Sequence, residues 1–144
     1  MKKLWLAATL ITLVGITALG CVQDKAAAEN ITSSFFEAIR KKDFDTALTF
    51  YSSKFFELNP NVDWLQVLKG VNKKLGDLEN YELTTYNLKK TFGTAENGTY
   101  CELQYKVTYS KYSATETFTL FKSATGGEYS IVGHKINSIG LALE

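Results

Sequence analysis

Several residue types that build chemical sites are scarce in this chain. Its 144 residues include one histidine, two cysteines and one proline. The lone His134 excludes a histidine-rich zinc site and leaves no complete ligand set with Cys101. The sequence also lacks a Gly-x-Ser-x-Gly elbow, a phosphate-binding glycine loop, a Cys-x-x-Cys pair and any paired-acid signature. We therefore expect no metal and no cofactor, and no motif names a reaction.

The chain also lacks an excess of charge of one sign. Its formal net charge is +1, and its lysine pairs at 41–42, 73–74 and 89–90 fall in different predicted elements. Nucleic acids and anionic lipid surfaces select proteins with a continuous basic surface. The sequence therefore argues against both as partners.

What the chain does have is a charged and then apolar amino terminus. Lys2 and Lys3 precede an uncharged apolar run from Leu4 to Leu19, and Ala18-Leu19-Gly20-Cys21 ends that run with small residues before a thiol. This order is typical of a secretory signal peptide. The last four residues resemble the bacterial lipobox, in which the cysteine receives a diacylglyceryl thioether. Ala18 and Leu19 depart from the commonest lipobox, where leucine comes first and a small residue second.

Two other interpretations of this segment stay open: an uncleaved membrane anchor, and ordinary signal cleavage without lipid. The charge-free stretch from Leu4 to Gly20 has 17 residues, whereas a helix that spans a bilayer needs about 20. The position of Cys21 directly after Gly20 argues against ordinary cleavage. We expect residues 1–20 to be removed and Cys21 to be lipidated, so that lipid anchors the protein in the bacterial cell envelope.

Two further expectations depend on this anchor. In a host that sorts lipoproteins by the residue after the cysteine, Val22, in place of an aspartate, favours the outer membrane facing the periplasm over the inner membrane. With the sulfur of Cys21 bound to lipid, Cys101 would be the only thiol of the mature chain. Cys101 lies in an alternating strand pattern, where a small buried packing residue is the simplest interpretation.

Behind the anchor we expect a short tether at residues 21–25 and a single domain from 26 to 144. The domain opens with apolar residues at helical spacing. Asp43 is a good N-cap for the second helix, the segment 59–61 breaks the chain, and Gly76 ends the third helix. The predicted helices cover about Asp24 to Lys41, Asp43 to Tyr51, and Trp64 to Leu75.

After Asp77 the apolar residues alternate, which predicts strands. Asn97-Gly98 predicts a two-residue hairpin turn, and Gly133 predicts a bulge or bend. The predicted strands are Leu78–Thr91, Cys101–Tyr109, Tyr112–Lys122 and Glu128–Ser138. On the second strand the apolar face consists of Cys101, Leu103, Tyr105, Val107 and Tyr109. Three helices followed by four antiparallel strands predict an α+β fold, with N-terminal helices packed on a curved, cone-like four-stranded sheet.

Two parts of this pattern resemble the nuclear transport factor 2-like superfamily. The run from Phe35 to Ala47 (FFEAIRKKDFDTA) is similar to its aromatic helix, turn and second helix. Segments 116–120 and 127–133 are similar to the final hairpin of its small members, which include envelope lipoproteins of unknown role. Those members commonly have tryptophan in place of Tyr129 and often an aromatic residue in place of His134.

The resemblance implies a conical sheet with a pocket at its wide end. It implies no activity, because the superfamily contains isomerases, dehydratases and polyketide cyclases as well as domains that only bind or dimerise. A fold shared by so many functions leaves the site to be argued from its own residues.

Glu116 is the residue that most suggests a site. By strict alternation it shares the apolar face of its strand and points into the cone, where a carboxylate against apolar walls could act as a general base, oriented by His134. The simpler alternative places Glu116 in solvent near the strand end and His134 after a bend that resets its direction. We expect no catalytic residue, and a binding pocket walled by Tyr105, Tyr109, Glu116 and His134.

Two function classes follow from these observations. The first is a noncatalytic binding or assembly module of the envelope, whose partner is a second copy, another envelope protein or a small apolar ligand. The second is a small lyase or isomerase that acts on an apolar ligand in the cone. An enclosed cavity at Glu116 and His134 would favour the second class, and a cone filled by its own aromatic side chains would favour the first. The threonines at 115, 117 and 119 predict either a dimerising sheet face or a plain solvated one.

Overall fold

The structure is a computed structural model that describes residues 16–93 and 96–143. Residues 1–15, which hold most of the predicted signal peptide, lie outside the described residues. The described elements are α1 (Ile16–Arg40), α2 (Phe44–Leu48), α3 (Ser53–Leu58), α4 (Trp64–Leu75), β1 (Leu78–Thr91), β2 (Gly98–Tyr109), β3 (Ser113–Ser123), β4 (Ser130–Asn137) and α5 (Ile139–Ala142). None of these helices is long and apolar enough to cross a membrane.

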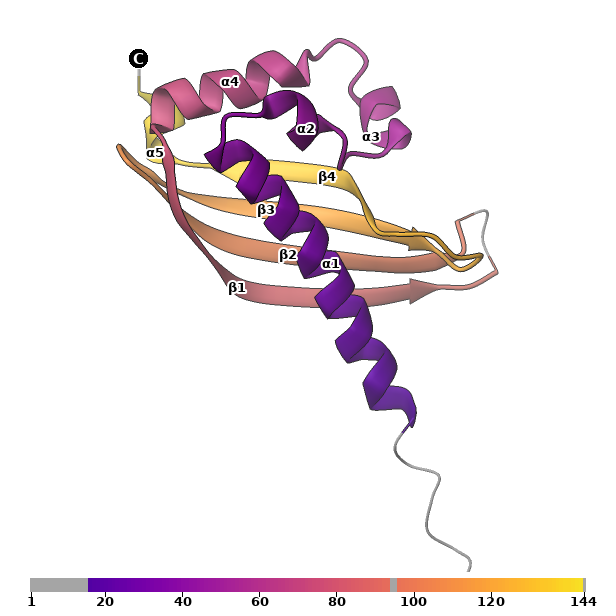
Figure 1. The fold of residues 1–144 in the computed structure, drawn as a ribbon. Coiled ribbons are helices and arrows are strands. Elements are labelled where there is room, and N and C mark those ends of the chain that lie inside the picture. The colour runs from indigo at the N-terminus through magenta and orange to yellow at the C-terminus, as the bar shows by residue number, and fades with distance from the viewer. Residues whose placement is uncertain (1–15, 94–95, 144) are drawn as a thin grey trace, which may run out of the picture.

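The four strands form one antiparallel sheet in the order β1-β2-β3-β4, with long, curved strands (Figure 1). Helix α1 crosses one face of this sheet diagonally, and α2, α3 and α4 lie on the same side. A bulge between Leu83 and Thr85 in β1 interrupts the pairing with β2, and such bulges increase the local twist of a sheet. The predicted α+β class, with helices on one face of a curved antiparallel sheet, is confirmed.

The helices agree with the sequence pattern in part. The third predicted helix is α4, with Asp63 as its N-cap and Gly76 after its end at a φ of 93°. Helix α2 begins after the predicted cap Asp43, whose carboxylate accepts a hydrogen bond from the amide of Thr46, but it ends at Leu48, before Tyr51. The short helices α3 and α5 were not predicted. Their side-chain caps are Ser52 and Ser138.

The first helix begins earlier than predicted. Helix α1 starts at Ile16 rather than Asp24, so residues 21–25, which we expected to form a tether, are helical. Asp24 is also 7% exposed and bound to Lys122 of β3. The part of the helix next to Cys21 is therefore fixed on the sheet.

The predicted two-residue turn at Asn97-Gly98 is wrong. Strand β1 ends at Thr91 and β2 begins at Gly98, and these two residues pair. Gly98 belongs to the strand and is not among the glycines with positive φ. Its role is close approach, because a Cβ at this position would lie 2.3 Å from the carbonyl oxygen of Lys122 and 2.6 Å from the ring of Phe121.

The last two strands differ from prediction only at their ends: Ser113–Ser123 replaces Tyr112–Lys122, and Ser130–Asn137 replaces Glu128–Ser138. The register between them slips next to Gly133, which confirms the predicted bulge. Thr119 pairs with Gly133, and the following Leu120 pairs with Ile131.

The helix-covered face of the sheet forms the core. On β2 the predicted apolar set from Cys101 to Tyr109 is buried, and the residues between them are half-buried or exposed. Above the sheet, Phe35 and Phe36 of α1 pack edge-on against Phe118 of β3, with ring centroids 5.3 and 5.5 Å away. Aromatic pairs favour edge-on geometries of this kind. The interior between helices and sheet is thus occupied largely by rings.

Candidate functional site

A chain of four hydrogen-bonded side chains lies inside the core. Glu116 of β3 is 1% exposed. Its Oε1 accepts a hydrogen bond from the hydroxyl of Tyr109 at 2.5 Å, and its Oε2 lies 2.9 Å from Nε2 of His134. The other ring nitrogen of His134, Nδ1, lies 2.6 Å from the hydroxyl of Tyr51. We call Tyr51, His134, Glu116 and Tyr109 the buried polar chain.

Four different segments place the members of the buried polar chain. Strand pairing sets Glu116 beside Ile136, two residues beyond His134 on β4, and Tyr109 ends β2. Tyr51 comes from the segment between α2 and α3, which forms a parallel bridge to Ile131 of β4. Backbone hydrogen bonds of 2.9 Å on either side of Tyr51, from Ser52 and to Phe50, hold this bridge.

Only one arrangement of protons gives every donor of the buried polar chain an acceptor. A tyrosine hydroxyl can donate one hydrogen bond, and a neutral histidine has one donor nitrogen and one acceptor nitrogen. If Tyr51 donates to Nδ1 of His134 and Nε2–H of His134 donates to Glu116, every donor in the buried polar chain has an acceptor. The negative charge then resides on Glu116, which accepts from both His134 and Tyr109.

Tyr51 and Tyr109 of the buried polar chain remain protonated. Burial, together with the negative charge of Glu116, raises the pKa of both Tyr51 and Tyr109. Both hydroxyls therefore act as donors over the whole physiological pH range. Burial of a charged carboxylate is tolerated only with such partners, because an unpaired buried charge is costly.

Aromatic rings enclose His134. Its imidazole is fully buried, and it stacks on Phe118 with centroids 4.1 Å apart and meets Phe35 edge-on at 5.4 Å. The indole of Trp64 lies nearly parallel to the imidazole at 6.3 Å, and its buried N–H has no hydrogen-bond partner. Water is therefore kept from the imidazole on the sides covered by these rings.

The space beside Glu116 is too small for a substrate. The cavity there has a volume of about 10 Å³, which is about the minimum needed for one water molecule. Ligand pockets commonly measure several hundred Å³. The residues around the cavity are Phe35, Ile39, Leu68, Val71, Asn72, Tyr109, Glu116 and Ile136.

The predicted pocket residues are therefore only partly brought together. Tyr109, Glu116 and His134 converge, and the alternative that placed Glu116 in solvent is wrong. Tyr105 is buried on the same face, but its hydroxyl lies 2.7 Å from that of Thr32 on α1. Burial, partly offset by this hydrogen bond, raises the pKa of Tyr105 to about 12. Tyr105 is thus occupied in joining α1 to the sheet.

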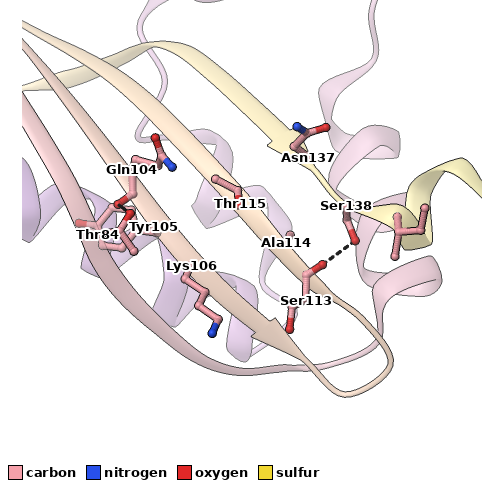
Figure 2. A pocket seen from close by; sticks show the side chains of 10 residues that line it. Thr84, Gln104, Tyr105, Lys106, Ser113, Ala114, Thr115, Asn137 and Ser138 are labelled. Atoms are coloured by element: carbon pink, nitrogen blue, oxygen red, sulfur yellow. Dashed lines mark hydrogen bonds between the residues drawn. The ribbon is translucent and has the colours of Figure 1, made fainter.

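A larger hollow lies on the opposite, uncovered face of the sheet. It has a volume of about 440 Å³. Gln104, Lys106 and Thr115 project from the middle strands on the side away from the helices (Figure 2). Its rim beside α5 is fixed by a 2.7 Å hydrogen bond from the hydroxyl of Ser138 to the backbone oxygen of Ser113. We call this hollow the outer groove.

A cluster of charged side chains lies where α1 meets the ends of the strands. The carboxylate of Asp24 accepts a 2.5 Å hydrogen bond from the ammonium of Lys122 and lies 3.9 Å from that of Lys90. Burial disfavours the charged form of Asp24, but the hydrogen bond and charge of Lys122 outweigh it and lower the pKa. The ammonium of Lys122 also lies 5.0 Å above the ring of Tyr129.

The two cysteines lie in different environments. Cys21 is exposed, Cys101 is buried, and neither forms a disulfide. Burial raises the pKa of Cys101 to about 11, which agrees with a packing residue rather than a nucleophile. Within the described ranges, no three histidine, cysteine, aspartate or glutamate side chains lie close enough together to hold a metal ion.

Comparison with known families gives a match over most of the chain. A family described as "Protein of unknown function (DUF4019)" matches residues 31–134. The chain belongs to this family. The matched range contains all four residues of the buried polar chain, together with most of the outer groove. No curated protein and no solved structure matches the chain.

Two members of these sites are not indicated by the sequence. The apolar spacing places Tyr51 on the face of a helix, and nothing in its local pattern indicates a hydrogen bond to His134, 83 residues later. The same spacing places Asp24 at the start of a helix, but its partner Lys122 is 98 residues away. In both cases the partner is set by how the helical layer lies on the sheet.

Proposed function

We propose that this protein is a membrane-tethered lipoprotein of the bacterial cell envelope, anchored through lipid on Cys21. Its domain is a noncatalytic binding module with the cone-like architecture of the nuclear transport factor 2-like superfamily. Its partner is another envelope protein or a second copy of this chain, received at the outer groove on the uncovered sheet face. The outer membrane, facing the periplasm, is the preferred location.

The observation that carries this proposal is the filled interior. Glu116 and His134 do converge, but the space beside them amounts to about 10 Å³. Aromatic rings from both layers take up the room that a ligand would need. Both carboxylate oxygens of Glu116 already form hydrogen bonds within the protein, one with Tyr109 and one with His134. This supports a structural role for the buried polar chain.

The outer groove is the better candidate for contact with a partner. Its lining combines polar and apolar surface, and the amide, hydroxyl and ammonium groups of Gln104, Thr115 and Lys106 are directed away from the core. Sites for small ligands are usually apolar and enclosed. An open surface of mixed polarity on a sheet fits a protein partner better, because protein–protein interfaces combine apolar area with a polar rim.

A second candidate function has one observation in its favour. Tyr51, His134 and Glu116 form a relay in which a carboxylate holds an imidazole against a hydroxyl, an arrangement used for general acid–base chemistry. A lyase or isomerase would need α4 to move, because Leu68 and Val71 of α4 cover the small cavity beside Glu116. An apolar substrate would then enter between α4 and the sheet.

The anchor is tested by changing the cysteine. Cys21→Ser should leave an unprocessed precursor that takes up no labelled fatty acid, whereas the wild-type chain should be processed and labelled. Cys101→Ser serves as the control, because a buried thiol in a strand plays no part in processing. Normal maturation and fatty-acid labelling of Cys21→Ser would refute the anchor.

The binding surface is tested by photo-crosslinking in living cells. A photoreactive amino acid at Thr115, in the outer groove, should give a discrete adduct. The same amino acid at exposed Asp45 of α2, on the helical side of the domain, is the control. An adduct of twice the mass of the chain indicates a second copy, and another mass indicates a different envelope protein. Adducts at Asp45 but not at Thr115 would contradict the assignment.

A further inference from the structure

The amino-terminal end of α1 continues past the sheet beside the edge strand β1. In Figure 1 the helix crosses the strands diagonally, and its first turns extend beyond β1. Cys21 lies seven and eleven residues before Ala28 and Thr32, which are fully buried, so all three lie on one stripe of the helix. Cys21 is nevertheless exposed. Its side chain therefore leaves the helix on the side that faces the sheet, at the point where the sheet has ended.

This end of the helix is held firmly. Asp24 is bound to Lys122 and lies close to Lys90. One residue later, the ammonium of Lys25 lies 5.1 Å above the ring of Tyr86 on β1. Three helical residues span about 4.5 Å, so Cys21 lies within one helical turn of these contacts. Lipid on Cys21 would thus emerge directly beside β1, with no flexible spacer to separate the domain from the bilayer.

The surface around this point exposes large apolar side chains. Phe92, two residues beyond Lys90, is 79% exposed, Val22 is 67% exposed and Tyr86 is 55% exposed. Tyr86 and Lys90 pair with the inward-facing Leu103 and Thr99 of β2, so both point to the side of the sheet on which α1 lies. We call the group the anchor-side surface; it comprises Cys21, Val22, Lys25, Tyr86, Lys90 and Phe92.

We propose that the anchor-side surface rests on the bilayer, with Phe92 and Tyr86 placed at the membrane–water interface next to the acyl chains on Cys21. Aromatic rings favour this interface, and lysines such as Lys25 and Lys90 can lay their aliphatic stems along apolar surface while their charges stay in water. The proposal rests on lipidation of Cys21. It adds a defined orientation, because the lipid alone would allow the domain to tumble.

The chemistry of the surface selects a lipid bilayer rather than a protein partner. Isolated apolar residues on a protein surface are common. Here Val22 directly follows the anchor residue, Tyr86 lies under the ammonium of Lys25, and Phe92 is two residues from Lys90, which lies close to Asp24. The acyl chains would keep the anchor-side surface next to lipid. A protein partner would have to compete with that bilayer for the same residues.

The test places a fluorescent label at the surface and a quencher in the membrane. The lipidated full chain with Phe92→Cys, labelled with an environment-sensitive dye, is reconstituted in phosphatidylcholine vesicles that carry a nitroxide on the acyl chain. The buried Cys101 remains unlabelled in the folded protein. The matched control is Leu58→Cys on α3, 66% exposed and part of the helical layer away from the first turns of α1.

The expected result is loss of fluorescence at position 92 and little loss at position 58, with both proteins floating with the vesicles. If the protein floats but position 92 is not quenched, or both positions are quenched alike, the orientation is overturned and the anchor stands. If neither protein floats, the lipid anchor itself fails, and the orientation falls with it.

Discussion

The two faces of the single sheet differ in how much space they leave for a ligand or partner. On the helix-covered face, alternate residues of β2 and β3 are buried, rings fill the space, and the polar groups of Glu116 and His134 bond to each other. On the uncovered face, Gln104, Lys106 and Thr115 border a hollow of about 440 Å³. Glu116 and His134, the residues that look catalytic, lie on the helix-covered face, whereas the accessible space lies on the uncovered face.

This contrast explains how a glutamate–histidine pair can be present without a substrate site. A polar network inside a core fixes which elements pack together, since each member loses a partner if one element moves. The buried polar chain connects β2, β3, β4 and the segment before α3 through four side chains. We interpret it as a device that fixes the helical layer on the sheet.

The largest difference in unfolding free energy is expected between substitutions of neighbouring residues on opposite faces of β3. Glu116→Ala leaves the buried donors of Tyr109 and His134 without an acceptor and should lower the free energy of unfolding by about 2–5 kcal/mol. Thr115→Ala, on the uncovered face, should change it by less than about 0.5 kcal/mol. Urea denaturation of the two variants measures the difference.

Glu116→Gln provides the control for charge. The amide oxygen can still accept from Tyr109, and the amide nitrogen can donate to Nε2 of His134 once the imidazole proton moves to Nδ1. Its loss of stability should therefore be smaller than that of Glu116→Ala. Equal losses for Glu116→Ala and Thr115→Ala would contradict the assignment of the two faces.

The same comparison on β2 involves packing alone. Val107 is fully buried, whereas Lys106 is exposed beside the outer groove. Truncation of Val107 to alanine should lower the free energy of unfolding by roughly 1–3 kcal/mol. Lys106→Ala should be close to neutral, and chemical denaturation of both variants decides the point. Similar effects at the two positions would mean that the register of β2 is different.

The smallest expected loss of stability concerns Asp24, at the edge of the helix-covered face. The pKa of Asp24 is below its usual value of 3.8. A lowered carboxyl pKa stabilises the fold above pH 3.8, and this stabilisation is lost as the pH falls below that value toward the folded-state pKa. Asp24→Asn should therefore lower the free energy of unfolding by about 1 kcal/mol at pH 7.

The pH series is the control for this prediction. The difference between Asp24→Asn and the wild-type chain should shrink as the pH falls below 3.8, because the wild-type carboxyl becomes neutral as well. A difference that stays constant from pH 7 to pH 3 would show that packing, rather than the charge of Asp24, is responsible.

Much of the fold could be predicted from the sequence because its signals are local. The apolar spacing from Trp64 to Leu75 and the cap at Gly76 define α4, and the alternation on β2 gives the correct buried face. The prediction of a turn at Asn97-Gly98 is wrong because Gly98 pairs with Thr91 of β1 and Ser123 of β3, which extends β2 through it. The four-residue helix α5 carries too few residues to show a period.

The site was predictable only where one strand carries it. Alternation alone places Glu116 inward, and antiparallel pairing brings β4 with His134 beside it. The contribution of Tyr51 depends on the bridge between its segment and Ile131, which no local pattern encodes. Whether the cone is open or filled depends on how Phe35, Phe36 and Phe118 pack together, and this is a property of the assembled core.

The most direct test of the closed interior is a high-resolution crystal structure of the mature chain, purified from its host without unfolding and begun no later than Val22, so that Asp24 keeps its contact with Lys122. We expect the only side chains bonded to Glu116 to be Tyr109 and His134, with room beside it for no more than a single water molecule. A bound small molecule in contact with Glu116, in a cavity opened beneath α4, would contradict it and would favour the lyase or isomerase.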